Sequence, residues 1–66
     1  MFNKNEFKAQ LVRKDMTMKE LAMFLGIDES TLYRKIQDDG RFTRQEINAM
    51  IDRLEIENPQ EIFFAS

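Results

Sequence analysis

Four polar residues near the middle of the chain have the types and the spacing of a hydrogen-bonding surface. Glu29 and Ser30 each precede one of Tyr33 and Arg34 by four residues, so in a helix the four side chains share one face. A guanidinium donates hydrogen bonds in a planar fork, hydroxyl groups donate and accept, and a carboxylate accepts. These groups suit the binding of a polar surface through hydrogen bonds.

The residues on which most catalytic and metal sites depend are missing. There is no cysteine and no histidine, which excludes disulfides, thiolate metal sites and cysteine nucleophiles and removes the commonest general base and zinc ligand. No nucleophile–base pair, metal cluster or phosphate-binding glycine loop is present. We therefore expect no enzyme activity, no cofactor, no metal and no small-molecule substrate.

Length and composition indicate one small folded domain over residues 1–66. Apolar residues make up 42% of the chain and charged residues 33%, which is typical of a folded chain. No apolar run approaches the roughly 20 residues that span a bilayer, and the start MFNKNEFK lacks the apolar stretch of a signal peptide. We expect a soluble intracellular module with no membrane partner.

Regularly spaced helix-start signals predict an all-α fold of five helices. At four places Asn or Thr is followed three residues later by Glu, the spacing of a capping box, and Asp28 offers a fifth N-cap. The four pairs are Asn3/Glu6, Thr17/Glu20, Thr43/Glu46 and Asn58/Glu61. With Gly26 as a C-cap, these signals predict helices over residues 4–14, 18–25, 29–37, 44–54 and 59–64.

Apolar residues recur at helical spacing in the predicted helices and form the expected core. They are Phe7, Leu11 and, as a further candidate, Val12; Leu21, Ala22 and Leu25; Leu32 and Ile36; and Ile47, Met50, Ile51 and Leu54. Ile56, Ile62 and one of Phe63 and Phe64 are expected to close the base of this core. We expect the core to hold the helix over residues 29–37 rigid.

The segment from Thr17 to Ile36 meets the geometric needs of a helix-turn-helix motif. Two short predicted helices flank a tight turn that contains Gly26, and the small Ala22 lets the second helix pack closely across the first. A motif of this kind places its second helix in the major groove of DNA.

This segment resembles the DNA-binding domains of the Cro and CI repressors of temperate phages, the XRE-type helix-turn-helix family. The matching residues are Leu21, Ala22, Leu25, Gly26, Ile27, Ser30, Thr31 and Leu32. Gly40–Thr43, Glu46–Ile47 and Glu61–Phe64 also resemble the small phage members, so the resemblance covers the chain from about Lys8.

The resemblance implies a compact five-helix bundle of the lambda-repressor-like DNA-binding type. It implies a transcriptional repressor of Cro type from a phage or prophage, acting at the nucleoid in the cytoplasm of a bacterial host. The helix over residues 29–37 would lie in the major groove of a double-stranded operator.

Particular residues carry the implied DNA contacts. Base contacts would come from Glu29, Ser30, Tyr33 and Arg34, with Arg34 donating to O6 and N7 of guanine. Phosphate contacts would come from Thr17, Lys19, Lys35, Arg41 and Arg44. Solvated surface charges are the alternative interpretation of Arg34 and Glu29.

The charge of the chain is acidic overall but unevenly distributed. Residues 1–44 hold nine basic and seven acidic side chains, a net +2, whereas residues 45–66 hold one basic and five acidic, a net -4. The acidity therefore lies in the last two predicted helices and need not face DNA. We expect a modest affinity with few ion pairs to phosphate.

Two exposed apolar positions favour a second hypothesis. Met23 and Phe24 follow Ala22 at positions where this family usually carries polar residues, and both point at least partly outward if Leu21, Ala22 and Leu25 face inward. One interpretation is a locally rotated helix or single exposed apolar groups. The alternative is a contact patch, with Val12 and Phe63 or Phe64 as candidates for a second patch. The alternative function is an antirepressor-like, protein-binding modulator on the same fold. We expect a monomer or a weak homodimer, formed in solution or on the two half-sites of an operator.

Overall fold

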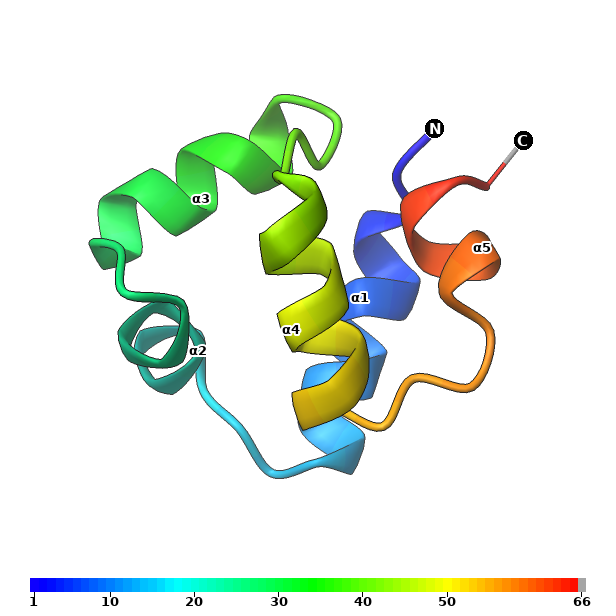
Figure 1. Cartoon of the computed structure of the whole chain (residues 1–66), viewed down its shortest axis with the longest axis horizontal. Coiled ribbons are helices and arrows are strands. Elements are labelled where there is room, and N and C mark those ends of the chain that lie inside the picture. Colours follow the sequence, from blue (N-terminus) through cyan, green and yellow to red (C-terminus); the bar gives the residue numbers. More distant parts are fainter. Residues whose placement is uncertain (66) are drawn as a thin grey trace.

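A computed structural model describes residues 1–65, and within them it contains five α-helices and no β-strand (Figure 1). The helices are α1 (Lys4–Arg13), α2 (Met18–Leu25), α3 (Glu29–Gln37), α4 (Arg44–Arg53) and α5 (Pro59–Phe63). The predicted all-α class is confirmed. Three helices end one residue earlier than predicted, because Lys14, Leu54 and Phe64 are the C-cap residues that follow α1, α4 and α5.

Two of the predicted capping boxes form completely, at the starts of α2 and α4. The hydroxyl groups of Thr17 and Thr43 accept hydrogen bonds from the backbone N–H of Glu20 and Glu46, both at 3.1 Å. The two carboxylates accept from the threonine backbone N–H groups in return, at 2.9 and 2.8 Å. Both helix starts are thereby set by residues three positions apart in the sequence.

The other predicted caps form only in part. The Asn3 side chain accepts from the backbone N–H of Glu6 at 3.1 Å. Asp28 and Asn58 occupy N-cap positions, but their side chains make no capping bond, so the expected side-chain caps there are wrong. At α5 the backbone carbonyl of Asn58 accepts the N–H of Glu61 at 3.0 Å and takes the place of the side-chain cap. The side chain of Asp28 is exposed to solvent.

One cluster of buried side chains lies among the five helices. In Figure 1, α4 crosses in front of α1, with α2 and α3 to one side of it and α5 to the other. The buried apolar residues are Phe2, Phe7, Leu11, Leu21, Ala22, Leu32, Ile36, Met50, Leu54, Ile56, Ile62 and Phe63. Leu25, Ile47 and Ile51 are partly buried and pack against this cluster. The expected core is therefore present, with Phe63 as its buried C-terminal aromatic residue.

Val12 does not belong to the core. Its side chain is 78% exposed, which contradicts the expectation that it extends the apolar stripe of α1. Phe7 and Leu11 lie one helical turn apart and are buried, whereas Val12 is turned about 100° from Leu11 around the helix axis. The buried face of α1 is completed instead by Gln10, whose amide donates to the carbonyl oxygen of Leu54 at 2.7 Å.

The beginning of the chain is tied to two distant segments. The backbone N–H of Asn3 donates to the carbonyl oxygen of Ile62 at 2.7 Å, so the two ends of the chain lie together (Figure 1). The backbone N–H of Phe2 donates to Oδ1 of Asp39 at 3.0 Å, in the loop between α3 and α4. The Phe2 ring lies 5.3 to 6.0 Å, between centroids, from the rings of Phe7, Phe42 and Phe63. This cluster fixes the loop that follows α3.

Candidate functional site

The outer face of α3 presents the four predicted base-contacting side chains to solvent. Glu29, Ser30, Tyr33 and Arg34 are all exposed, and Tyr33 is 45% exposed. Ser30, Tyr33 and Arg34 line one shallow hollow on this face, together with Gln37 and the acidic Asp38. Gln37 was not among the predicted site residues, although it follows Arg34 by three positions and Tyr33 by four. Glu29 lies outside the hollow, in the first turn of the helix.

The opposite face of α3 holds the helix in the core. Leu32 is fully buried and Ile36 is 3% exposed. The connection from α2 to α3 is short because Gly26 adopts a left-handed backbone conformation, with φ of 74°. The backbone N–H of Ile27 donates to the carbonyl oxygen of Ala22 at 3.0 Å, which closes the end of α2. The exposed face of α3 is therefore presented by a helix whose rotation is set by packing.

Lys35 lies on the side of α3 that faces α4. Its Nζ is 2.8 Å from both Oε1 and Oε2 of Glu46, and only 22% of the lysine side chain and 13% of the glutamate side chain are exposed. Burial raises the pKa of Glu46, but the hydrogen bonds from Lys35 and Thr43 outweigh burial and hold the pKa below its ordinary value. The pair fastens the end of α3 to the start of α4. A phosphate group would have to compete with Glu46 for the Lys35 ammonium.

The remaining predicted phosphate contacts are exposed at the starts of helices or in loops. Thr17 and Lys19 lie at the start of α2, Arg41 in the loop before α4, and Arg44 at the first position of α4. Nε of Arg41 is 3.4 Å from Oδ2 of Asp38, in an exposed pair. In the described part of the chain Lys19 and Arg44 form no ion pair. Their charges are thus available to a ligand or a partner.

The apolar positions singled out from the sequence are exposed as expected. Met23 is 72% exposed, Phe24 46% and Phe64 62%. Met23 and Phe24 lie on α2, while Phe64 directly follows α5, and Figure 1 shows these helices on opposite sides of α4. Phe64 therefore does not extend the exposed apolar surface of α2.

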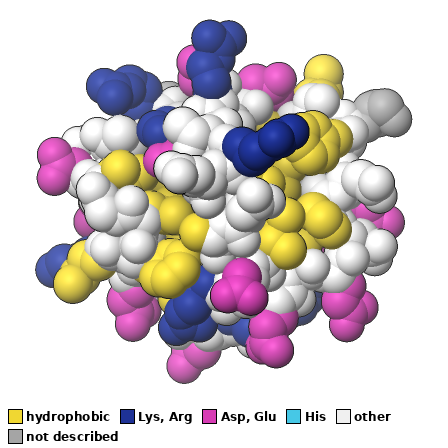
Figure 2. All heavy atoms as spheres, in the orientation of Figure 1, with side chains coloured by type: hydrophobic (Ala, Val, Ile, Leu, Met, Phe, Trp, Pro, Cys, Tyr) yellow, Lys and Arg dark blue, Asp and Glu magenta, His cyan; other side chains and the backbone are white. Residues whose placement is uncertain are grey.

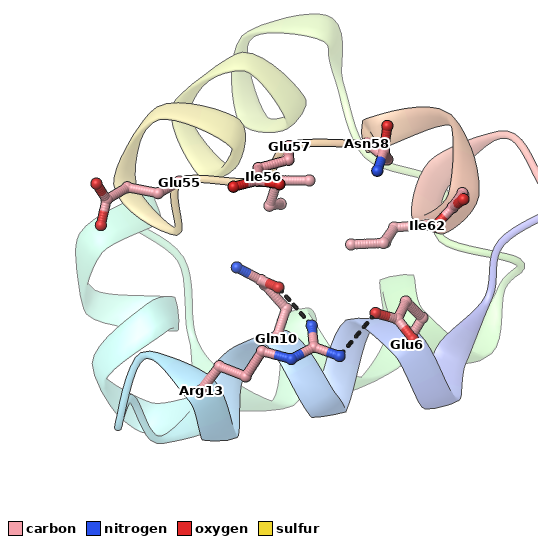
Figure 3. A pocket seen from close by; sticks show the side chains of 9 residues that line it. Glu6, Gln10, Arg13, Glu55, Ile56, Glu57, Asn58 and Ile62 are labelled. Carbon is pink, nitrogen blue, oxygen red and sulfur yellow. Dashed lines mark hydrogen bonds and ion pairs between the residues drawn. The ribbon is translucent and has the colours of Figure 1, made fainter.

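A pocket of about 290 Å³ opens between α1, α5 and the segment that joins α4 to α5 (Figure 3). The Arg13 guanidinium donates to Oε1 of Gln10 at 2.7 Å and lies 3.1 Å from Oε1 of Glu6. Three further carboxylates line the pocket, those of Glu55, Glu57 and Glu61. Four carboxylates against one guanidinium disfavour an anionic ligand there. None of the described residues of α2 or α3 lines this pocket.

Residues 1–65 hold neither a cluster of metal ligands nor a helix that could span a membrane. No group of three or more carboxylates in this range is arranged to hold a metal ion. None of the helices in this range combines the length and the apolar character needed to cross a bilayer. Comparison of the chain with protein-family models, with curated proteins and with solved structures found no match.

Proposed function

We propose that this protein is a sequence-specific DNA-binding transcriptional regulator of the Cro type, a phage or prophage repressor in which α3 lies in the major groove. The observation that carries the proposal is the division of α3 into two faces. Ser30, Tyr33 and Arg34 share an exposed hollow, while Leu32 and Ile36 are buried on the other side. A rigid helix with one polar, exposed face is what reading base edges requires.

The residues of α3 have distinct roles in this proposal. Arg34 donates two hydrogen bonds to O6 and N7 of a guanine, the commonest specific contact in the major groove. Tyr33 contacts a thymine methyl group or a phosphate oxygen, and Ser30 donates to or accepts from a base or phosphate. Glu29 accepts from N4 of a cytosine or repels phosphate at wrong sites.

Binding to the DNA backbone comes from the start of α2. The positive charge of Lys19 favours a phosphate there, and its side chain is exposed and unpaired in the described part of the chain. The N–H groups of Thr17 and Glu20 are already bonded within the capping box. Lys35 is held by Glu46 and contributes to phosphate binding only if that pair opens. With few free cations, affinity is modest and falls with salt.

Two DNA-binding measurements on the purified full chain test the proposal. A gel shift with random-sequence DNA at low salt should show binding, because non-specific dissociation constants of such proteins are about 10⁻⁴ to 10⁻⁶ M. Selection from a random DNA pool should then enrich a short motif. Lys4→Ala serves as a control. It removes one positive charge from the exposed start of α1 and should leave the selected motif unchanged. A chain that shifts no DNA up to about 10⁻⁴ M at low salt is not a DNA-binding regulator.

The exposure of Met23 and Phe24 favours a second candidate, an antirepressor-like modulator that binds another protein. Both side chains are exposed on α2, at 72% and 46%, next to the buried Ala22. In this case the chain should release a CI-type repressor from its operator without binding DNA itself. Phe24→Glu should abolish the release, and Val12→Glu, at an exposed apolar position of α1, should retain it.

A further inference from the structure

One exposed edge of α4 carries a row of three polar residues with opposite charges at its two ends. Arg44, Asn48 and Asp52 follow one another at intervals of four residues, so they lie along the same side of the helix. All three are exposed, and within residues 1–65 none of their side chains forms a hydrogen bond or an ion pair. The row reads positive, neutral amide, negative.

An apolar groove lies beside this row. It has a volume of about 280 Å³ and is formed by α4 and the C-terminal segment, with Ile47, Ile51, Pro59 and Phe64 as its apolar lining. Arg44 and Asn48 also line it, so two of the three residues of the row border the groove, while Asp52 lies outside its lining. Figure 2 shows apolar side chains reaching the surface between α4 and α5 on the face turned to the viewer. Phe64 is the most exposed of them, at 62%.

We propose that this surface binds a second copy of the chain, with the two α4 helices antiparallel and the two-fold axis close to Asn48. Arg44 and Asp52 are each four residues from Asn48, about 6 Å along the helix. The two-fold axis therefore places Arg44 of each copy opposite Asp52 of the other. A two-fold interface must be complementary to itself, and the order of charges in this row satisfies that condition.

Asn48 and the groove complete the complementarity. An amide both donates and accepts hydrogen bonds, so Asn48 pairs with its own copy at the axis and fixes the register of the two helices. The apolar side chains of the groove are then buried against those of the other copy and removed from water; they are Ile47, Ile51 and Phe64. A partner without this reversed order of charges would leave Arg44 or Asp52 facing a like charge or no charge.

The size of the surface predicts a weak dimer. A helix of ten residues is about 15 Å long, and an interface of that length belongs to the small, transient class. The interface uses residues of α4 and the C-terminal segment, so it stands whether or not α3 binds DNA. It gives Arg44 a partner other than phosphate.

Charge reversal on the full chain tests the pairing directly by sedimentation at several protein concentrations. Arg44→Asp places Asp opposite Asp52, and Asp52→Arg places Arg opposite Arg44, so each variant should raise the dimer dissociation constant at least about tenfold. Neither change should unfold α4, because an acidic residue near a helix start and a basic residue near its end are both favourable. Circular dichroism checks that both variants are folded.

Two combinations of these substitutions test the antiparallel arrangement of the two α4 helices. The double variant R44D/D52R should dimerise like the wild type, and an equimolar mixture of the two single variants should form a heterodimer, because Asp then faces Arg at both contacts. Lys8→Asp changes the net charge as Arg44→Asp does, at an exposed position of α1, and should have no effect. Phe64→Glu should abolish dimerisation.

Three outcomes would overturn the proposal. The first is a wild-type chain that stays monomeric up to about 1 mM, which would assign the groove to a different partner. The second is a dimer unaffected by Arg44→Asp. The third is a mixture of folded single variants that stays monomeric while the wild type dimerises.

Discussion

At the scale of single residues, Arg34 and Lys19 separate the reading of bases from the binding of the DNA backbone. Arg34→Ala should weaken binding to the selected sequence by about 1–3 kcal/mol and relax the preference at one or two base pairs. Lys19→Ala should weaken binding to all sequences alike and make the salt dependence shallower. Fluorescence anisotropy with selected and scrambled DNA at several salt concentrations measures both effects. An unchanged sequence preference in Arg34→Ala would show that Arg34 does not read a base.

The two glycines differ in what a side chain would meet. Both have a positive φ, of 74° at Gly26 and 65° at Gly40. A Cβ at Gly26 would meet nothing within 4 Å, so Gly26→Ala should cost only the backbone strain, about 1–2 kcal/mol. A Cβ at Gly40 would lie 2.3 Å from Cγ of Phe2, so Gly40→Ala should be more destabilising. Urea unfolding measures the free energy of unfolding of both variants. An equal decrease in the two would mean that Phe2 moves aside freely.

At the scale of the elements, the pair between Lys35 and Glu46 connects α3 to α4 and makes stability depend on pH. The pKa of Glu46 is below its ordinary value of 4.5 in the folded protein. The pair therefore stabilises the fold fully above about pH 4.5, and this contribution is lost as the pH falls through the lowered pKa.

Glu46→Gln tests this contribution. At neutral pH the change should cost about 1–3 kcal/mol, because it leaves the half-buried Lys35 ammonium without its counter-charge. The variant should also lose less stability than the wild type between neutral and acidic pH. Glu57→Gln, at an exposed position, is the control for the loss of one carboxylate. Urea unfolding at a series of pH values measures both, and parallel curves for Glu46→Gln and the wild type would exclude this role.

At the scale of the whole molecule, the aromatic cluster joins the two ends of the chain to the loop after α3. Phe63 is 7% exposed, and its ring centroid lies 6.0 Å from that of Phe2 and 6.3 Å from that of Phe42. Its removal opens a cavity among segments that are far apart in sequence.

Neighbouring phenylalanines provide a matched comparison. Phe63→Ala should cost about 3–5 kcal/mol, which is most of the stability of so small a domain. Phe64→Ala, at a position that is 62% exposed, should change the free energy of unfolding by no more than about 0.5 kcal/mol from the wild type. Thermal unfolding followed by circular dichroism should find Phe63→Ala largely unfolded at 37 °C. A melt of Phe63→Ala close to that of Phe64→Ala would place Phe63 outside the cooperative core.

The sequence by itself determined the helices, because their signals are local. Thr17 and Glu20, or Thr43 and Glu46, interact across three residues, and the periodic apolar residues mark the buried face of each helix without reference to any partner. The exposure of the predicted base-contacting residues follows from the same periodicity, so that much of the candidate site was predictable as well.

Tertiary structure alone decided which faces meet. Val12 is exposed because the buried face of α1 includes Gln10, which contacts a carbonyl group 44 positions away. Lys35 was predicted as a phosphate contact, but Glu46 is brought beside it when α4 packs against the end of α3. The groove beside Ile47 and Ile51 exists only because the chain returns to place Phe64 there. Contacts between distant segments depend on how the elements pack, and no local spacing in the sequence encodes them.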